Sequence, residues 1–261
     1  MDAVTRTLRE GFVAEVAVMP SPPGASSTGV PPELLRKLLA SYGLVILRGL
    51  RLAPSALAAF SQHLGVPQPH PQQGPFPAHP DSRYVQVVRS RTDGSAEPYT
   101  WCWHTDSSSR LNPPRYTLLQ AAALPETGGD TLFADMVSAY RHLPPHWKHL
   151  LEGAVGIHVH PLWGGTARHP VITMLPDGRQ ALYLNHVAMS GIESPRGTHG
   201  PGLIDSLIAY ATQEDFVYRH CWGPDEILAW DNNTVMHRAT PLLPGAHRVM
   251  HRLAVASPQP H

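Results

Sequence analysis

Two hydrophobic periods divide the chain into a short helical part and a longer strand-rich part. In the first part, apolar residues recur at helical spacing over 33–43 and again over 53–65, and each run ends at a glycine. The apolar run at 44–50 is rich in strand formers, so the pattern predicts helix, strand and helix. A short strand is expected before them, followed by a loop over the Pro/Gly/Ser-rich residues 20–32.

From residue 83 onward, short alternating or apolar runs lie between turn residues, after a proline-rich span at 67–80 that is expected to be loop. One helix is predicted at 202–213, where the apolar residues form a single face. Strands are predicted over 83–88, 115–124, 129–136, 154–162, 169–174, 180–185, 226–232 and 248–255. The pattern therefore predicts a mainly β protein, with a double-sheet core and a few flanking helices.

Composition excludes several classes of protein. Lys plus Arg equals Asp plus Glu at 20 each, so no overall field attracts nucleic acid or an anionic membrane. The apolar runs are too short to span a bilayer, the start lacks a signal-peptide pattern, and only two cysteines are present. We expect a cytoplasmic protein, either monomeric or a homo-oligomer. The 17 histidines direct attention to metal or acid–base chemistry.

Candidate metal ligands begin in the segment WHTDSSSR, residues 103–110. In an extended strand, residues two apart project from the same face, so His104 and Asp106 can approach one ion together. A satisfied polar strand end would give the same spacing, and for this pair alone that interpretation stays open. His237, which follows a predicted strand and an Asp-Asn-Asn turn, supplies a third ligand. Two histidines and one carboxylate on one face of a metal are the arrangement that non-haem iron(II) uses.

Two arginines on the last predicted strand are candidates for binding anions. Arg248 and Arg252 have an even spacing that places both guanidinium groups on one side, while Val249 and Leu253 are apolar on the other. Buried arginines need anions, and a guanidinium group matches a carboxylate in a bidentate manner. A dicarboxylate near the metal would satisfy at least one of them. A surface strand with solvated charges is the alternative.

An ordered set of motifs along nearly the whole chain resembles the taurine-dioxygenase-like family of iron(II)- and 2-oxoglutarate-dependent oxygenases. The set comprises YGLVILRGL, FSQHLG, the WHTD box, PETGGDTLFADM, HPVI with ALYLN, W-x-P-D before WDNNTVMHRA, and the terminal R-x-x-x-R. The resemblance implies a double-stranded β-helix, or jelly-roll, in a single domain over 1–261, with most of this core and all metal ligands within 82–261. It also implies one Fe(II) held by His104, Asp106 and His237.

The resemblance further implies the cosubstrate and the reaction. Arg248 and the hydroxyl group of Thr131 are expected to hold the distal carboxylate of 2-oxoglutarate, and Arg252 is expected near its 1-carboxylate or near the substrate. With O2, such an enzyme hydroxylates an aliphatic C–H bond of a small molecule, while 2-oxoglutarate is decarboxylated to succinate. The protein supplies orientation and a shielded pocket, so no catalytic side chain is expected beyond the metal centre.

Departures from the family pattern concern the substrate. Residues 107–110, Ser-Ser-Ser-Arg, make a pocket edge polar where the family often has a hydrophobic run. Thr100 stands where taurine-specific members carry asparagine, and Asn233 replaces the usual arginine. The resemblance therefore does not extend to taurine as the substrate.

The expected substrate is a small anionic molecule, because Arg252 needs an anion once the pocket closes. His70 matches a substrate-pocket position of the family, although a surface loop fits its sequence equally well. The candidate substrate contacts are His70, Thr100, Ser107, Arg110 and Arg252.

Two other functions remain open at this point. One is an oxidase of the same family that desaturates, cyclises or rearranges a specialised metabolite. The other is a jelly-roll that binds a metal or ligand without turnover, which a missing ligand residue would have favoured. The His-Val-His run at 158–160 is expected to be a strand with two outward imidazoles rather than a source of catalytic bases.

Overall fold

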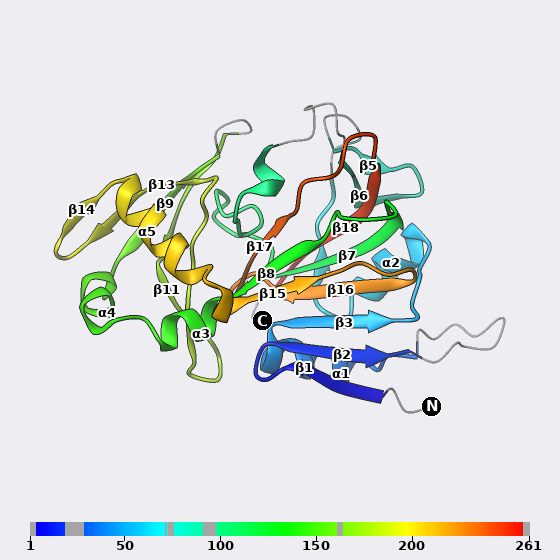
Figure 1. Cartoon of the computed structure of the whole chain (residues 1–261), viewed down its shortest axis with the longest axis horizontal. Coiled ribbons are helices and arrows are strands. Elements are labelled where there is room, and N and C mark those ends of the chain that lie inside the picture. Colours follow the sequence, from blue (N-terminus) through cyan, green and yellow to red (C-terminus); the bar gives the residue numbers. More distant parts are fainter. Residues whose placement is uncertain are drawn as a thin grey trace.

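A large sheet forms the centre of the computed structural model, which describes residues 4–18, 29–70, 72, 76–90, 98–160 and 164–257 (Figure 1). Within these residues it has nine strands, antiparallel except for the parallel pair β2 and β3. Their order is β1 (Val4–Arg9), β2 (Val13–Ala17), β3 (Leu44–Arg48), β16 (Glu226–Asp231), β7 (Tyr116–Ala123), β18 (Arg248–Ala256), β6 (Ser82–Ser90) and β5 (Ala78–His79), with β4 (Val66–Pro67) beside β18.

A second, smaller sheet packs against one face of the large one. It consists of β15 (Val217–His220), β8 (Thr131–Asp135) and β17 (Val235–Ala239). Phe133 and Val235 of the small sheet share a buried core with Leu228 and Trp230 of the large sheet. The two sheets face each other as in a jelly-roll, and their inner side chains line the space between them.

Two helices cover the opposite face of the large sheet. They are α1 (Pro32–Tyr42) and α2 (Pro54–Ser61), and each has proline in its first turn, where the missing N–H costs nothing. Their apolar faces pack on β3, β16 and β18 in one buried cluster. Gly43 ends α1 with a positive φ of 80°, and a Cβ at this position would lie 2.8 Å from Thr234 Oγ1.

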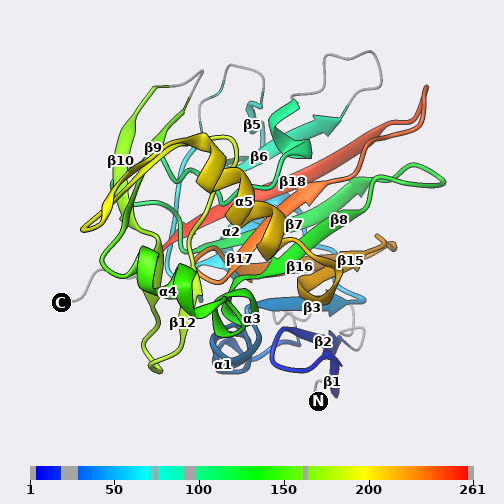
Figure 2. The same ribbon diagram turned by 60° about the vertical axis from the view of Figure 1, so that its left-hand side comes forward.

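A third group of elements lies beside the small sheet (Figure 2). A four-stranded sheet runs β10 (Thr166–Pro170), β9 (Val155–Val159), β13 (Met189–Ser194) and β14 (Gly197–His199) within the described residues, and β11 (Ile172–Met174) pairs with β12 (Gln180–Leu182). The helices here are α3 (Met136–Arg141), α4 (Pro145–Leu151) and α5 (Pro201–Ala211). They share a buried core with β12 and β13.

The prediction of a mainly β protein with flanking helices and a jelly-roll core is confirmed. Each predicted helix and strand has a counterpart, although the single strand predicted near the start is a pair, β1 and β2. The elements that were not predicted are α3, α4 and the strands β4, β5, β13, β14, β15 and β17. Helices of six or seven residues are too short for a helical period to be visible, although the carboxylate of Asp135 accepts hydrogen bonds from two N–H groups at the start of α3.

Two loop predictions have different outcomes. The predicted loop at 20–32 falls mostly outside the described residues. The proline-rich span at 67–80 is loop where it is described, apart from Pro67 at the end of β4 and the two residues of β5. Within the described part of the chain, every helix is too short or too polar to cross a membrane.

Candidate active site

Two histidines from distant parts of the chain are held side by side by their own backbones. His104 donates its N–H to the carbonyl oxygen of His237 at 3.0 Å, and His237 donates its N–H to that of His104 at 2.9 Å. Residues paired in this way project their side chains from the same face. The two imidazole rings lie with centroids 4.2 Å apart, and the ring of His237 also packs on Trp230.

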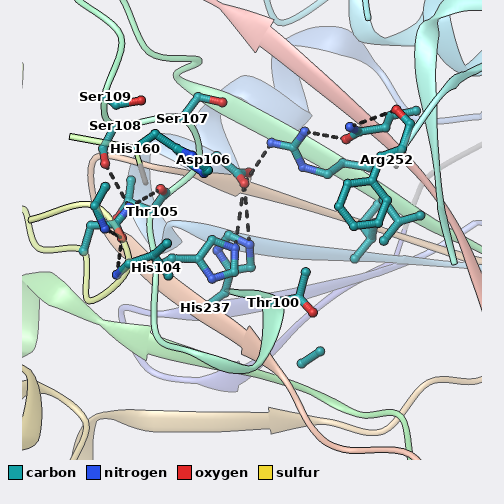
Figure 3. A pocket seen from close by; sticks show the side chains of 18 of the residues that line it. Thr100, His104, Thr105, Asp106, Ser107, Ser108, Ser109, His160, His237 and Arg252 are labelled. Atoms are coloured by element: carbon teal, nitrogen blue, oxygen red, sulfur yellow. Dashed lines mark hydrogen bonds and ion pairs between the residues drawn. The ribbon is translucent and has the colours of Figure 1, made fainter. Parts of the chain in front are cut away.

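Asp106 completes the group through a turn rather than through the extended strand that the sequence predicted. Residues 106–109 form a turn in which Ser107 has a positive φ of 50°. Oδ1 of Asp106 lies 4.0 Å from Nε2 of His104 and 3.8 Å from Nε2 of His237 (Figure 3). The ligand atoms of all three residues lie within 4.8 Å of one another. The predicted trio is therefore brought together.

The protonation states of these residues are those that a metal requires. Burial lowers the pKa of His104 and of His237, so both imidazoles are neutral at physiological pH. Burial alone would raise the pKa of Asp106, but Arg252, with the two histidines, holds it well below its usual range. Metal ligation needs neutral imidazoles and an ionised carboxylate, and all three residues meet this condition.

Neighbouring polar groups fix the direction of two ligands. Nδ1 of His104 bonds the carbonyl oxygen of Cys102 at 2.8 Å, which leaves Nε2 for a metal. Oδ2 of Asp106 accepts a hydrogen bond from Oγ1 of Thr117 at 2.6 Å, which leaves Oδ1 directed towards the histidines. The residues present therefore fit one divalent metal ion with open positions.

Asn232 and Thr117 support the carboxylate, and the site predictions did not include them. The side-chain amide of Asn232 donates to Oγ1 of Thr117 at 3.0 Å, and its oxygen accepts from the indole of Trp230. The neighbouring Asp231 serves the turn itself, because its carboxylate accepts from the backbone N–H of Asn233. The link from Asn232 through Thr117 to Asp106 depends on strands that are distant in sequence.

Arg252 is paired within the protein, which corrects the argument made from its sequence. Its Nη2 lies 2.8 Å from Oδ1 of Asp106, and its Nη1 donates to Oε1 of Gln86 at 3.1 Å. The expectation that Arg252 needs an external anion assumed that it has no partner within the protein, and that assumption was wrong. The sequence could not reveal this pair, because it depends on the turn that carries Asp106.

Arg248, unlike Arg252, has no direct ion-pair partner among the described residues. It is only 4% exposed, and none of the described carboxylates forms an ion pair with it. Its Nη2 donates to Oγ1 of Thr131 at 2.9 Å, while its Nε is buried without a hydrogen-bond partner. Burial lowers the pKa of Arg248 to about 10, so the group is still charged at neutral pH.

A cavity of about 610 Å³ joins these groups. Its lining includes the three ligand residues together with Thr131, Arg248 and Arg252. The candidate substrate contacts His70, Thr100, Ser107 and Arg110 line the same cavity, as do His160 and Asn185. Apolar side chains make up much of the remaining wall, among them Phe76, Val88, Leu119, Val187 and Met250. The volume is sufficient for two small organic molecules.

The expectation of two outward imidazoles at 158–160 was wrong. His158 is fully buried and bonds Ser108 Oγ at 3.0 Å, His160 lines the cavity, and Val159 between them is the exposed residue. The strand alternates as predicted but with the opposite face inward, because the turn carrying Ser108 covers it. Asn185 also donates to Ser108 Oγ, so this turn is held from two sides.

The fold and the site together define a mononuclear metal centre with two histidines and a carboxylate, at the inner end of a jelly-roll cavity. The sequence model described as "Taurine catabolism dioxygenase TauD, TfdA family" matches residues 5–254. The chain therefore belongs to the TauD/TfdA family of Fe(II)- and 2-oxoglutarate-dependent dioxygenases, as the motifs predicted. Fe(II) and 2-oxoglutarate are accordingly the metal and cosubstrate for which the trio His104, Asp106 and His237 is suited.

Individual relatives differ in the reactions that they catalyse. An alpha-ketoglutarate-dependent 2,4-dichlorophenoxyacetate dioxygenase from Burkholderia sp. (strain RASC) is 37% identical over 153 residues, which are 52% of this chain and 51% of the relative. The match thus spans about half the length of that relative. Pentalenolactone F synthase from Streptomyces arenae is 27% identical over 257 residues, 85% of each chain. The crystal structure of AAD-2 in complex with Mn(II) and N-oxalylglycine is 25% identical, with a TM-score of 0.81, covering 100% of this chain and 99% of that one.

Proposed function

We propose that the protein is an Fe(II)- and 2-oxoglutarate-dependent dioxygenase that hydroxylates an aliphatic C–H bond of a small anionic molecule. The observation that carries the proposal is the buried Arg248, which lacks an ion-pair partner among the described residues and lines the same cavity as His104, Asp106 and His237. An unpaired buried charge is costly, so this position favours a ligand that brings a carboxylate.

2-Oxoglutarate has the two carboxylates that this arrangement requires. Arg248 and Thr131 would hold the distal carboxylate, and His104, Asp106 and His237 would hold the metal to which the keto acid binds. The complex of AAD-2 with Mn(II) and N-oxalylglycine supports this proposal, because N-oxalylglycine differs from 2-oxoglutarate only by an NH in place of one methylene group.

The charges around the cavity favour an acidic substrate. Fe(II) and 2-oxoglutarate cancel one another in charge, and Asp106 cancels Arg252, so Arg248 leaves one positive charge in excess. Arg110 adds a second cation at the exposed edge, and the other ionisable groups of the described lining are histidines. An acidic group on the substrate, placed between Arg252 and His70, balances the inner excess, with Thr100, Ser107 and Arg110 as further contacts.

The protein's own contribution is to position and shield the reactants. When bound, Fe(II) with 2-oxoglutarate and O2 supplies the oxidation, in which 2-oxoglutarate becomes succinate and carbon dioxide and the substrate gains one oxygen atom. Arg248 and Thr131 orient the cosubstrate, Arg252 keeps Asp106 ionised, and the apolar wall excludes water from the reacting C–H bond. No side chain is required as a nucleophile.

A desaturating, cyclising or rearranging oxidase is the second candidate. The observation that favours it is the match to Pentalenolactone F synthase, which covers 85% of both chains, whereas the match to the 2,4-dichlorophenoxyacetate dioxygenase covers about half. A synthase of this kind would use the same metal, cosubstrate and cavity. The two candidates differ in the product and not in the consumption of 2-oxoglutarate.

The test is succinate formation by the Fe(II)-loaded protein with 2-oxoglutarate and O2. The panel contains an aryloxyacetate, an alkylsulfonate and an alkyl sulfate, each beside a neutral amide or alcohol of the same size. We expect at least one acid to stimulate succinate release, with a hydroxylated product by mass spectrometry, and its neutral partner to be much weaker. A product two mass units lighter than the substrate would indicate the oxidase instead.

Two controls decide the remaining outcomes. His237→Ala, prepared in the same way, should form no succinate above the background of free iron. Equal stimulation by acids and neutral partners would contradict the anionic substrate class. Absence of succinate from the wild-type protein with every compound, and also without any compound, would favour the non-catalytic binding protein.

A further inference from the structure

Trp222 lies directly behind Thr131, in the segment between β15 and β16. Its indole Nε1 donates a hydrogen bond to Oγ1 of Thr131 at 3.0 Å. Nη2 of Arg248 donates to the same oxygen at 2.9 Å. Thr131 and Arg248 line the cavity, whereas Trp222 is not part of its described lining. The indole thus acts on the cavity only through these two residues.

These two hydrogen bonds restrict the direction of the threonine hydroxyl group. A hydroxyl oxygen has two lone pairs and one hydrogen, while an indole N–H and a guanidinium N–H can only donate. With both lone pairs occupied, Thr131 can use its hydroxyl group only as a donor, in a third direction. A carboxylate accepts hydrogen bonds only, so this arrangement presents a donor to an acidic ligand before the ligand arrives.

The face of the same indole ring also contacts Arg248. The guanidinium carbon lies 5.6 Å from the ring centroid of Trp222, within the range of a cation–π interaction. The indole also packs perpendicular to the ring of His220 at a centroid distance of 5.0 Å, and His220 bonds the buried Glu226 at 3.0 Å. The indole is therefore fixed from behind and contacts both the cation and the hydroxyl group.

We propose that Trp222 is a positioning residue for 2-oxoglutarate: it holds the hydroxyl group of Thr131 as a donor, and Arg248 in place, for the distal carboxylate. This inference rests on the role given above to Arg248 and Thr131. It adds a residue that does not itself touch the cosubstrate and that acts through a hydrogen bond to Thr131.

The experiment measures the dissociation constant of 2-oxoglutarate for the Mn(II)-loaded protein by calorimetry in the absence of oxygen. The variants are Trp222→Phe, which keeps an aromatic ring but removes the N–H donor, Thr131→Val, and the double variant. Loss of one hydrogen bond predicts about 3- to 10-fold weaker binding for Trp222→Phe. In the Thr131→Val background the same change should have no further effect, because the hydroxyl group that it orients is absent.

Three controls separate positioning from general damage. Trp147→Phe removes an indole of α4 that packs on Tyr210 of α5, away from the cavity, and should leave binding unchanged. Thermal unfolding of each variant checks the fold, and Trp222→Met, which also lacks a hydrogen-bond donor, replaces Trp222→Phe if the latter is unfolded at the assay temperature. The Michaelis constant for 2-oxoglutarate should rise in Trp222→Phe, with a much smaller change in kcat.

The outcomes distinguish this inference from the function on which it depends. Binding by Trp222→Phe as tight as that of the wild type would overturn it. Losses that simply add in the double variant would also overturn it, because they would show an effect independent of the hydroxyl group. Wild-type protein that fails to bind 2-oxoglutarate with Mn(II) would overturn the proposed cosubstrate as well.

Discussion

Arg248 and Arg252 lie on the same strand and line the same cavity, yet their surroundings differ in charge. The region around Arg252 contains its own anion, because Asp106 lies 2.8 Å away and Gln86 accepts a second hydrogen bond. The region around Arg248 contains the neutral partners Thr131 and Trp222, and one guanidinium nitrogen has no partner. Of two arginines on one strand, Arg252 is thus paired with a carboxylate of the protein, whereas Arg248 can pair with a carboxylate of a ligand.

The difference shows which region depends on a ligand. The ion pair of Arg252 stabilises the ligand-free site and keeps a metal-binding carboxylate ionised. The direct contacts of Arg248 are neutral, and the carboxylate of Asp130 acts on it only from beyond ion-pair distance, so an arriving carboxylate would form its first direct ion pair. A buried cation without an ion-pair partner in the protein therefore marks a ligand-binding position better than one that is already paired with a carboxylate.

Loss of a metal ligand residue should have the largest effect on activity, because the metal site lies in the same cavity as both arginines. His237→Ala takes away one of three ligands, and we expect metal affinity to fall by more than about 100-fold, since even outer-sphere changes cost 10- to 100-fold. Metal content after dialysis, measured by mass spectrometry, should fall together with succinate formation. Full metal content with normal turnover in this variant would contradict the assignment of the trio.

Arg248→Lys tests the region without an internal anion. Lysine keeps the charge but loses the fork of parallel donors, and charge-assisted hydrogen bonds contribute about 1.5–3 kcal/mol. The Michaelis constant for 2-oxoglutarate should therefore rise about 10- to 100-fold, with little change for the substrate. Equal changes in both constants would show that the two regions are not distinct in function.

Arg252→Gln tests the region with an internal anion. We expect the preference for acidic over neutral substrate analogues to fall by about 10-fold, because one cation near the substrate is lost. Binding of 2-oxoglutarate should be retained within about threefold of the wild type in the same calorimetric assay. A collapse of 2-oxoglutarate binding with unchanged charge preference would instead place Arg252 with the cosubstrate.

The smallest effect concerns His70, whose pKa is lowered to about 4 by burial, then by Arg252 and Arg110. Above pH 6.5 His70 is neutral in both the folded and the unfolded chain, so its titration does not reduce stability. Below the unfolded pKa of about 6.5 the unfolded chain binds a proton that the folded chain does not, which favours unfolding. The free energy of unfolding therefore decreases as the pH falls towards 4, by about 1 kcal/mol at pH 5 after allowance for the partial exposure of His70. Urea unfolding at pH 7 and pH 5 should show a smaller pH effect in His70→Asn.

The site residues could be selected from the sequence, whereas their contacts could not. The spacing of His104 and Asp106, the late His237 and the terminal arginine pair made these residues candidates, and the family resemblance assigned them to the metal and the cosubstrate. The same reasoning placed Asp106 on a strand and His158 on an outer face, and both placements were wrong. A period of two determines which residues share a face but not which face is buried.

The sequence by itself determined the order of the longer helices and of most strands, and the chemical types in the site, because periodicity, proline and glycine act locally along the chain. Tertiary structure decided which charge is paired. Asp106 meets Arg252 because a turn with a positive φ carries the carboxylate across to β18, and Trp222 meets Thr131 because the segment after β15 folds behind β8. These contacts join residues more than ninety positions apart, and their energies depend on distances that no local pattern contains.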